Sequence, residues 1–408
     1  MSSAPRSIRV AAGQMEALPI GRSAEAWPAI ERLLAEAARA GAELLVLPEC
    51  AHPAYYLESP ERYRAADVLP SGAVLERLGR LAAAARLHLC CGLAEEREGR
   101  LFNSAALFDP AGRLIGVARK SFLWDCDHRW FTPGKAIRVF ETALGRVGVM
   151  ICADARVPEI AATLARRGAQ LVAMPTAWVN TGRDAATVYN IQPDFLIEAR
   201  AREFGLPFVC ADKSGPEPPL HYVGQSLVAG AAGQVLIRAP VEGEALVTAE
   251  LTLGSSRPAR LTAAQRERLA WPAARVHATN VAAQPATLAI DPGGFQTGPA
   301  RAARIEGAEA ASFAAARCHA LDGAQVLCVR DAPADRATLR ARAAENRMYL
   351  LADGAAGRMV IDPVGAVRKE TAPNHPLSVQ VDLAEADRKQ FTPETDLWAG
   401  RRVEQYEF

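Results

Sequence analysis

Short apolar runs alternate along the chain with stretches in which apolar residues recur every three or four positions. The runs at 7–15, 43–49 and 87–96 predict strands, because their apolar residues are nearly continuous and partly β-branched. The stretch from about 24 to 40 has the spacing of an amphipathic helix, and Gly41 follows it as a helix-ending signal. Alternating strands and helices are typical of an α/β fold with a layered sheet.

The alternation continues beyond residue 100. Residues 101–120 predict a hairpin, because the turn-forming sequence Asp-Pro-Ala-Gly at 109–112 separates two apolar runs. A strand is then expected over 145–154, a helix over 158–168 and another strand over 169–178.

The second part of the chain resembles the region that follows this hairpin. Residues 166–175 (RRGAQLVAMP) resemble 321–330 (LDGAQVLCVR), and residues 199–212 resemble 341–353 with one gap. Self-similarity of this kind indicates a repeated structural unit.

The repeat predicts a half-copy without catalytic residues. We expect residues from about 300 to 385 to be a decayed copy of the region from about 147 to 255. The copy lacks a counterpart of the Cys152 thiol, because the offset between the two regions aligns Cys152 with Gly307. Between them, the stretch 256–300 is rich in Ala, Pro and Gly, and we expect part of it to be a linker.

The charge balance limits the partners to expect. The chain has 408 residues, with 47 Lys and Arg against 46 Asp and Glu, so nothing favours a nucleic acid or an anionic membrane as partner. The N-terminus lacks the apolar core of a signal peptide, and no run of about 18 apolar residues is present. Eight scattered cysteines without a CxxC pair favour free thiols in a reducing cytoplasm over disulfides or zinc ligands.

Cys152 is a candidate nucleophile. It stands where the apolar strand that ends at Ile151 gives way to a helical segment. A strand end followed by a helix start forms a tight elbow that directs backbone N–H groups toward the side chain. Such groups lower a thiol pKa and can hold an oxyanion. The alternative is a buried structural cysteine.

A nucleophilic cysteine needs a base, and no histidine stands in an obvious motif. Glu49 closes the apolar run Leu-Val-Leu-Pro-Glu, where desolvation raises a carboxyl pKa toward the working range of a base. An ordinary loop glutamate is the alternative. Lys120 ends another apolar run, where it is either a cation that stabilises an oxyanion or a surface residue reaching solvent.

Together these residues resemble the nitrilase, or carbon–nitrogen hydrolase, superfamily, which carries a Glu–Lys–Cys triad in three ordered motifs. The first stands here as Leu-Pro-Glu49-Cys-Ala-His-Pro-Ala-Tyr55 and the second as Arg-Lys120-Ser-Phe-Leu. The third is Gly-Val-Met-Ile-Cys152-Ala-Asp154. Three motifs in the right order are far more specific than any one of them.

The resemblance covers about residues 8–255. It implies a four-layer αββα sandwich, and with the repeat it predicts a catalytic domain over 1–280. A degenerate, non-catalytic half-repeat with a C-terminal arm is then expected over 281–408. Nitrile-hydrolysing members typically have Trp-Glu after the nucleophile, whereas this chain has Ala153-Asp154, which favours the amidase or N-carbamoylase-like branch.

The resemblance also implies a mechanism. Glu49 takes the thiol proton, Cys152 attacks the substrate carbon, and Lys120 with the backbone N–H of Ala153 holds the developing oxyanion. Glu49 then protonates the leaving amine and activates water to cleave the thioester. No metal or organic cofactor is implied.

Four further residues are candidates for substrate binding. Many family members have a glutamate where Asp127 stands, so this shorter carboxylate positions substrate or, alternatively, is a surface turn residue. Arg156 would hold a substrate carboxylate or pair with a neighbouring acidic residue. Tyr55 is a pocket candidate, and Trp178 is either pocket wall or core.

The leading functional prediction is hydrolysis of a small amide or N-carbamoyl amine through a thioester. The alternatives are nitrilase or glutaminase activity, and a non-catalytic scaffold that retains the fold; a cysteine protease lacks its paired histidine. We expect a homodimer or higher homo-oligomer with a small-molecule substrate. We further hypothesise that residues 300–385 dock on the catalytic domain as an internal pseudo-partner, because they keep helical patterns such as 339–347.

Overall fold

The computed structural model describes residues 6–66, 69–182, 187–272 and 282–408. Packing divides the chain into two units. Unit 1 comprises Met1–Pro258 and Gln405–Glu407, and unit 2 comprises Ala259–Glu404 and Phe408. The domain boundary expected between residues 280 and 281 lies outside the described residues and stays a prediction.

Unit 1 contains two sheets and the helices that cover them. The strands of its first sheet are β1 (Arg6–Glu16), β2 (Leu44–Val46), β3 (His88–Arg97), β4 (Arg100–Phe108), β5 (Leu114–Arg119), β10 (Lys213–Glu217), β11 (Leu220–Val223) and β14 (Ala245–Leu253). Those of its second sheet are β6 (Arg138–Thr142), β7 (Gly145–Val149), β8 (Leu171–Pro175), β9 (Phe208–Ala211), β12 (Leu227–Ala229) and β13 (Val235–Arg238). The helices are α1 (Ala26–Arg39), α2 (Pro60–Ala65), α3 (Ser71–Ala85), α4 (Asp127–Trp130), α5 (Pro158–Arg166) and α6 (Ile197–Phe204), with the short η1 (Ile20–Glu25), η2 (Cys152–Arg156) and η3 (Gln192–Leu196).

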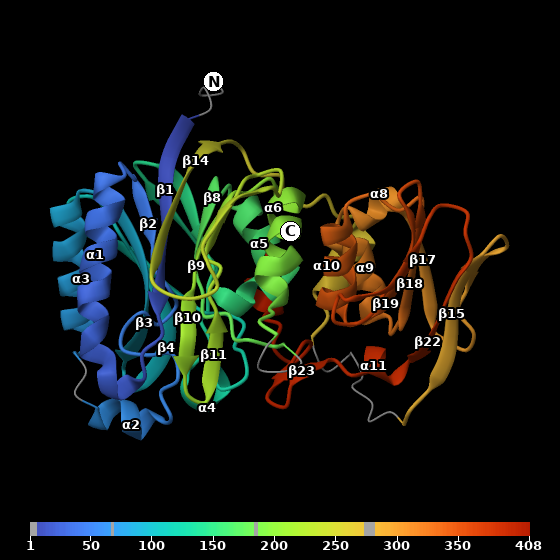
Figure 1. The fold of residues 1–408 in the computed structure, drawn as a ribbon, viewed down its shortest axis with the longest axis horizontal. Helices are drawn as coiled ribbons and strands as arrows, with labels where there is room; N and C mark the ends of the chain where they lie inside the picture. Colours follow the sequence, from blue (N-terminus) through green and yellow to red (C-terminus); the bar gives the residue numbers. More distant parts are fainter. Residues whose placement is uncertain (1–5, 67–68, 183–186, 273–281) are drawn as a thin grey trace. The chain divides into compact units, whose positions relative to one another are not determined.

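The two sheets of unit 1 pack face to face. The first has the order β11-β10-β1-β2-β3-β4-β5, with β14 also paired to β1, and the second has the order β13-β12-β9-β8-β7-β6. Helices α1 and α3 cover the first sheet and α5 and α6 cover the second (Figure 1). The predicted four-layer αββα sandwich is therefore confirmed.

Local signals in the sequence explain these elements. The buried face of α1 contains Ile30, Leu33 and Leu34, which pack on the first sheet. Gly41 adopts a φ of 71° just after this helix, a conformation that costs little for glycine. The turn between β4 and β5 closes with a hydrogen bond from the Gly112 N–H to the Asp109 carbonyl, as expected from its sequence.

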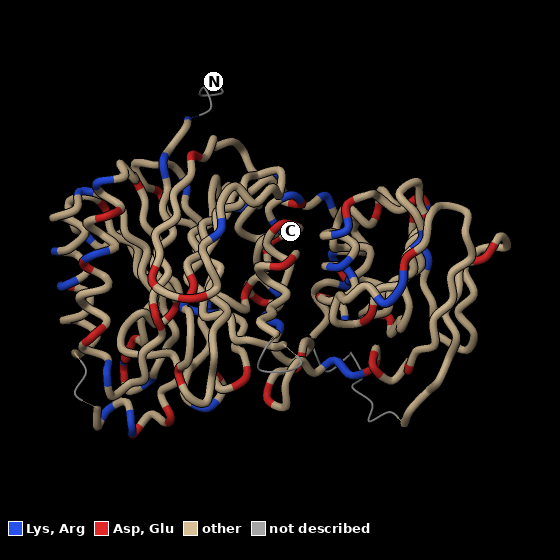
Figure 2. The backbone as a smooth tube through the Cα atoms, in the orientation of Figure 1, with Lys and Arg blue, Asp and Glu red and all other residues tan. Residues whose placement is uncertain are grey.

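Charged residues of both signs are interspersed along the outer helices of unit 1 (Figure 2). Arg77 on α3 pairs with Glu31 on α1 at 2.9 Å, and Arg32 on α1 pairs with Glu244 at 2.8 Å. These exposed pairs each contribute little to stability, about 0.2 to 1 kcal/mol. Among the described residues, no helix is both long enough and apolar enough to cross a membrane.

Among the described residues, unit 2 has three sheets of its own. Its larger sheet contains β17 (Ala302–Glu306), β18 (Val326–Arg330), β19 (Tyr349–Gly354), β20 (Gly357–Ile361) and β21 (Val367–Thr371). The smaller sheets contain β15 (Pro285–Asp291), β16 (Gly294–Gln296) and β22 (Leu377–Asp382), and β23 (Gln390–Thr392) with β24 (Thr395–Asp396). The helices are α7 (Ala263–Leu269), α8 (Gly307–Ala310), α9 (Phe313–Leu321), α10 (Arg336–Asn346) and α11 (Ala384–Asp387), with η5 (Val403–Gln405) near the end of the chain.

The larger sheet of unit 2 repeats part of the second sheet of unit 1. Its order β17-β18-β19-β20-β21 matches β7-β8-β9-β12-β13, with two parallel pairs followed by two antiparallel pairs in each case. Helices α9 and α10 stand where α5 and α6 stand in unit 1. A second partial domain is thus present, as the internal similarity indicated. Residues 256–300, part of which we expected to be a linker, contain α7, β15 and β16. Helix α7 packs on α9, and β15 pairs with β22, so these elements belong to the packing of unit 2.

Candidate active site

Cys152 lies in a sharp turn just after β7. Its φ is 45°, a left-handed conformation that is costly for a residue with a side chain and that recurs at functional sites. The first turn of η2 begins at this residue, and the Sγ atom lies 3.7 Å from the Ala177 carbonyl oxygen after β8. The side chain is 6% exposed, so the elbow points it into the protein.

Asp154 fixes this elbow to the segment that follows Lys120. Its carboxylate accepts hydrogen bonds from the N–H groups of Ile151 (3.0 Å), Ser121 (3.1 Å) and Phe122 (2.8 Å). Burial raises the pKa of Asp154 to about 6, while these N–H groups favour the ionised form. The motif contained Asp154, but its anchoring role depends on contacts that only the folded chain makes.

Glu49 follows β2 at the carboxyl edge of the first sheet. Its N–H donates to the Thr176 carbonyl at 3.1 Å, which ties it to the segment that also contacts the Cys152 thiol. Its Oε1 atom accepts hydrogen bonds from Asn103 Nδ2 at 2.6 Å and from Lys120 Nζ at 2.7 Å. Burial raises the pKa of Glu49, against the opposing attraction of Lys120, so the carboxylate is a stronger base than an exposed one.

Lys120 is fully buried between two carboxylates. Its Nζ atom lies 2.7 Å from Glu49 Oε1 and 2.6 Å from Asp127 Oδ2. Burial opposes the charge, but the attraction of Asp127 and Glu49 outweighs burial and holds the pKa of Lys120 well above its usual range. The alternative interpretation, in which Lys120 is a surface residue that reaches solvent, is therefore wrong.

Asp127 is also buried, so the alternative of a surface turn residue is wrong. It begins α4, and its Oδ2 atom accepts the Trp124 N–H at 2.9 Å in addition to the Lys120 ammonium. Its shorter side chain still reaches Lys120, because α4 brings the backbone close to the lysine. Within the described residues its Oδ1 atom has no hydrogen-bond partner.

The pKa of the Cys152 thiol is shifted in the direction opposite to the one predicted from the sequence. The elbow was expected to lower its pKa, yet burial and the charge of Glu49 raise the pKa well above its usual range, against the opposing effect of Lys120. Full burial outweighs the N–H groups at the turn. The resting thiol therefore keeps its proton, and nucleophilic attack requires a base close by.

The remaining candidates lie around this cluster. Tyr55 is buried, its ring centroid 5.5 Å from Lys120 Nζ, and Trp178 is fully buried directly after Ala177. Arg156 stacks on the ring of Trp124 at 4.0 Å. Ala153 follows Cys152 within η2. A substrate role for each of these residues stays a prediction.

Two polar residues of the site had no predicted role. Asn103 donates a hydrogen bond to the Glu49 carboxylate, and the sequence alone does not say which group its side chain faces. Gln192 Nε2 lies 3.8 Å from Cys152 Sγ, at the start of η3. No local signal marks Gln192, because the contact joins residues that are distant in sequence.

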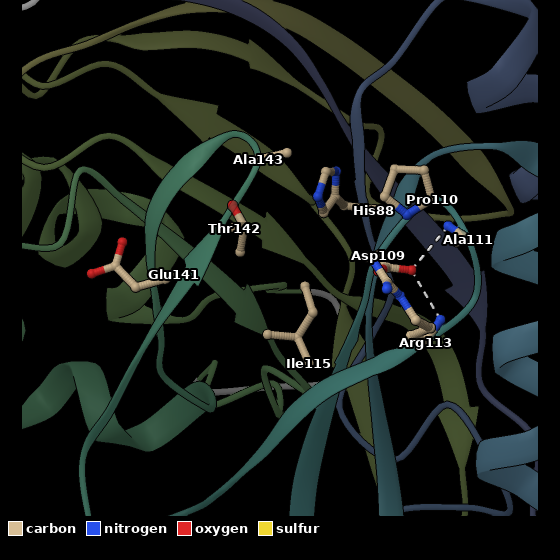
Figure 3. Close-up of a pocket in the computed structure, with 9 residues that line it drawn as sticks. All are labelled: His88, Asp109, Pro110, Ala111, Arg113, Ile115, Glu141, Thr142 and Ala143. Carbon is tan, nitrogen blue, oxygen red and sulfur yellow. Dashed lines mark hydrogen bonds and ion pairs between the residues drawn. The ribbon is translucent and has the colours of Figure 1, made fainter.

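A separate cavity of about 570 Å³ lies in unit 1 at the start of β3 and the β4–β5 turn (Figure 3). Asp109 there accepts hydrogen bonds from the Ala111 and Arg113 N–H groups, so its carboxylate is engaged in shaping the turn. Glu49, Lys120 and Cys152 do not line this cavity. Among the described residues, no cluster of His, Cys, Asp or Glu is arranged to hold a metal ion.

The sandwich is similar to that of nitrilase-superfamily amidases. A solved structure of the amidase from Nesterenkonia AN1, of that superfamily, matches with a TM-score of 0.51 and 29% identity over 59% of this chain and 90% of that chain. Residues 9–261 match the family model for carbon-nitrogen hydrolases. The chain therefore belongs to the carbon-nitrogen hydrolase family.

Proteins with similar sequences include both amidases and nitrilases. A nitrilase of Pyrococcus abyssi is 35% identical over 233 residues, which cover 57% of this chain and 85% of the relative. The omega-amidase of Homo sapiens is 32% identical over 230 residues, which cover 53% of this chain and 79% of the relative.

Proposed function

We propose that this chain hydrolyses a small amide by cysteine-dependent catalysis, with N-carbamoyl amines as the next substrate class. The observation that carries the proposal is the buried cluster in which Lys120 bridges Glu49 and Asp127, with the Cys152 thiol within electrostatic range of Glu49. A buried cation held by two carboxylates, beside a protonated thiol and a carboxylate of raised pKa, supplies every group that acyl transfer needs.

In the proposed reaction Glu49 takes the Sγ proton as Cys152 attacks the carbonyl carbon. The carbonyl electron pair moves to oxygen, and the oxyanion is stabilised by Lys120 and the Ala153 N–H. Collapse of the tetrahedral intermediate breaks the carbon–nitrogen bond, and the amine leaves with the proton held by Glu49. Water, deprotonated by Glu49, then cleaves the thioester and regenerates the thiol.

The burial of the site supports a small substrate. Cys152 is 6% exposed and Glu49 and Lys120 are fully buried, so a bulky acyl group has little access to the nucleophile. The carboxylate of Asp154 accepts hydrogen bonds from three backbone N–H groups, so its proposed role is to hold the turn at Cys152 in place. The acrylamide adduct on the active-site cysteine of the Nesterenkonia amidase further favours a short amide.

We also propose the assembly and location of the protein. The proposed assembly is a homodimer or a higher homo-oligomer. Eight free, buried cysteines favour a reducing cytoplasm. Size-exclusion chromatography with light scattering tests the assembly, and a monomer at micromolar concentration would overturn it.

Ammonia release tests the function. The purified protein is assayed on aliphatic, aromatic and ω-amides, N-carbamoyl amino acids, N-carbamoyl amines and nitriles, the last because of the similarity to a nitrilase. We expect release from a short amide by the wild type and by Cys328→Ala, a matched change of a buried cysteine in unit 2, but not by Cys152→Ala. Equal release by Cys152→Ala would refute the proposal, and release from nitriles alone would move it to nitrilase chemistry.

A further inference from the structure

Gln192, the first residue of η3, places a polar side chain next to the thiol of Cys152. Its Nε2 atom lies 3.8 Å from Cys152 Sγ, and the side chain is 2% exposed. The thiol also contacts the Ala177 carbonyl, which lies on the segment after β8. The carboxamide of Gln192 is therefore part of the immediate surroundings of the reacting sulfur.

The backbone at Gln192 is built in an unusual way. Residues Gln192–Leu196 form a single π-helical turn that leads into α6, and such turns are rare and recur at functional sites. Asn190 fixes this turn, because its Oδ1 accepts the Gln192 N–H at 2.9 Å and its Nδ2 donates to the Val179 carbonyl at 2.9 Å. Asn190 thus anchors the backbone at Gln192 to the segment after β8 before any substrate arrives.

One end of the Gln192 carboxamide has no partner. Within the described residues, Oε1 is buried without a hydrogen bond, and so is Nε1 of the neighbouring pocket candidate Trp178. Buried polar atoms are nearly always hydrogen-bonded, and an unpaired one is costly. An unpaired acceptor on a side chain that also contacts the nucleophile indicates a group that is satisfied by substrate.

We propose that Gln192 is a specificity-determining residue whose Oε1 accepts a hydrogen bond from the N–H of the scissile amide. The inference rests on the proposed function and deepens it, because it names the substrate class as amides that carry at least one N–H on the leaving nitrogen. With the substrate oxygen held by Lys120 and the Ala153 N–H, the leaving nitrogen lies on the other side of the carbonyl carbon, where an acceptor is needed. An ester of the same acyl group lacks this N–H and leaves Oε1 unpaired.

The test compares an amide with the matching ester in two readouts. The first is kcat/KM for a short primary amide and for the methyl ester of the same acid. The second is the rate at which acrylamide and methyl acrylate add to Cys152, followed by intact mass, which requires a reactive thiol but no turnover. In each readout the amide-to-ester ratio isolates the hydrogen bond to N–H from general effects on the thiol.

Gln192→Leu, which removes the carboxamide at similar volume, is expected to lower the amide-to-ester ratio about tenfold, the size of one buried hydrogen bond. Gln192→Glu keeps an acceptor oxygen and is expected to preserve the ratio while slowing both reactions, because its charge faces the sulfur. Gln296→Leu, the same change at an exposed position in unit 2, serves as the control. Thermal unfolding is recorded for each variant.

The outcomes separate this inference from the proposed function. An unchanged ratio in Gln192→Leu, with wild-type hydrolysis of both substrates, overturns the role of Gln192 and leaves the function intact. Wild type that hydrolyses neither substrate refutes the proposed function, and the labelling ratio still decides the role of Gln192. If Gln192→Leu does not fold, the amide-to-ester ratio of Gln192→Glu decides. A ratio below that of the wild type overturns the inference, and an unchanged ratio supports it.

Discussion

The two units contain the same strand–turn–helix arrangement, but only unit 1 has a cysteine, the proposed nucleophile Cys152, at the turn; unit 2 has Gly307 there. In unit 1 the buried Arg200 of α6 donates its Nε to the carbonyl of Ala155 at 3.0 Å, three residues after Cys152. In unit 2 the buried Arg342 of α10 donates its Nε to the carbonyl of Ala310 at 3.0 Å, three residues after Gly307. The scaffold contact is thus repeated in detail where the chemistry is missing.

The pairing of these arginines is repeated as well. Arg200 lies 3.7 Å from Glu203, and Arg342 lies 2.5 Å from Glu345, each pair three residues apart on its helix. A contact that is present in both units belongs to the fold, which assigns Arg200 to support of the turn at Cys152. At Gly307 a Cβ atom would lie 2.0 Å from the Asp331 carbonyl oxygen, so the half-copy has no space for any side chain there.

The largest effect is expected from removing the thiol. Cys152→Ala should reduce kcat on the best amide by more than about a thousandfold, because the covalent step is lost. Gly307→Cys in the same protein should not restore activity and should destabilise unit 2, because its side chain meets the Asp331 carbonyl. Activity assays and urea unfolding measure the two effects. Turnover by the double variant would break the comparison between the units.

A smaller effect is expected from the second carboxylate. Asp127→Asn should lower kcat/KM about tenfold, because Lys120 loses one of its two partners. The charge of Asp127 raises the pKa of Glu49, and a base acts only when deprotonated. Without that charge the pKa of Glu49 falls, so the acid limb of the kcat/KM–pH profile should move to lower pH. Glu98→Gln, an exposed change, is the control, and a shift to higher pH would contradict the assignment.

The paired arginines sharpen the comparison directly. Arg200→Met and Arg342→Met should each lower the free energy of unfolding by about 3 kcal/mol, because each leaves a buried glutamate with one partner fewer. Only Arg200→Met should lower kcat, by about fivefold, since only its elbow carries a nucleophile. Calorimetry and steady-state assays measure both changes. A matching loss of kcat in Arg342→Met would show that the half-copy acts on the reaction.

The smallest effect concerns the end of the chain. Gln405 accepts a hydrogen bond from Ser121 Oγ at 3.1 Å and donates to the Gly134 carbonyl at 2.9 Å, while the Gly134 N–H donates to the Lys120 carbonyl. Gln405→Ala should lower kcat about twofold and the free energy of unfolding by about 1 kcal/mol. Measurement of kcat for Gln405→Ala and for the control Gln390→Ala, an exposed change in β23, tests this. Identical kcat values in the two variants would show that the C-terminal segment does not support the site.

Much of the fold and the central site could be predicted from the sequence, because their signals are local. Gly41 ends α1, the turn at 109–112 joins β4 to β5, and Glu49, Lys120 and Cys152 each stand in a motif. The ends of β2, β5 and β7 precede these three residues; β2 and β3 are parallel, and β5 runs in the same direction as β3 because β4 pairs antiparallel with both.

What escaped prediction depends on tertiary contacts. Asp127 looks like a turn residue until α4 directs it at Lys120, and Gln192 carries no pattern that points to Cys152. The thiol pKa is set by burial, which outweighs the turn's N–H groups. Gln405 meets Ser121 across most of the chain, a separation at which composition and periodicity carry no information.

The return of Gln405–Glu407 to unit 1 has a consequence for biosynthesis. Domains generally fold in order as the chain emerges from the ribosome, the N-terminal one first. Here the first unit remains incomplete until residues 405–407 have left the ribosomal tunnel, because Gln405 holds Ser121 and the Glu407 N–H donates to Thr163 on α5. Residues 259–404 are therefore synthesised before the segment next to Lys120 gains the support of Gln405.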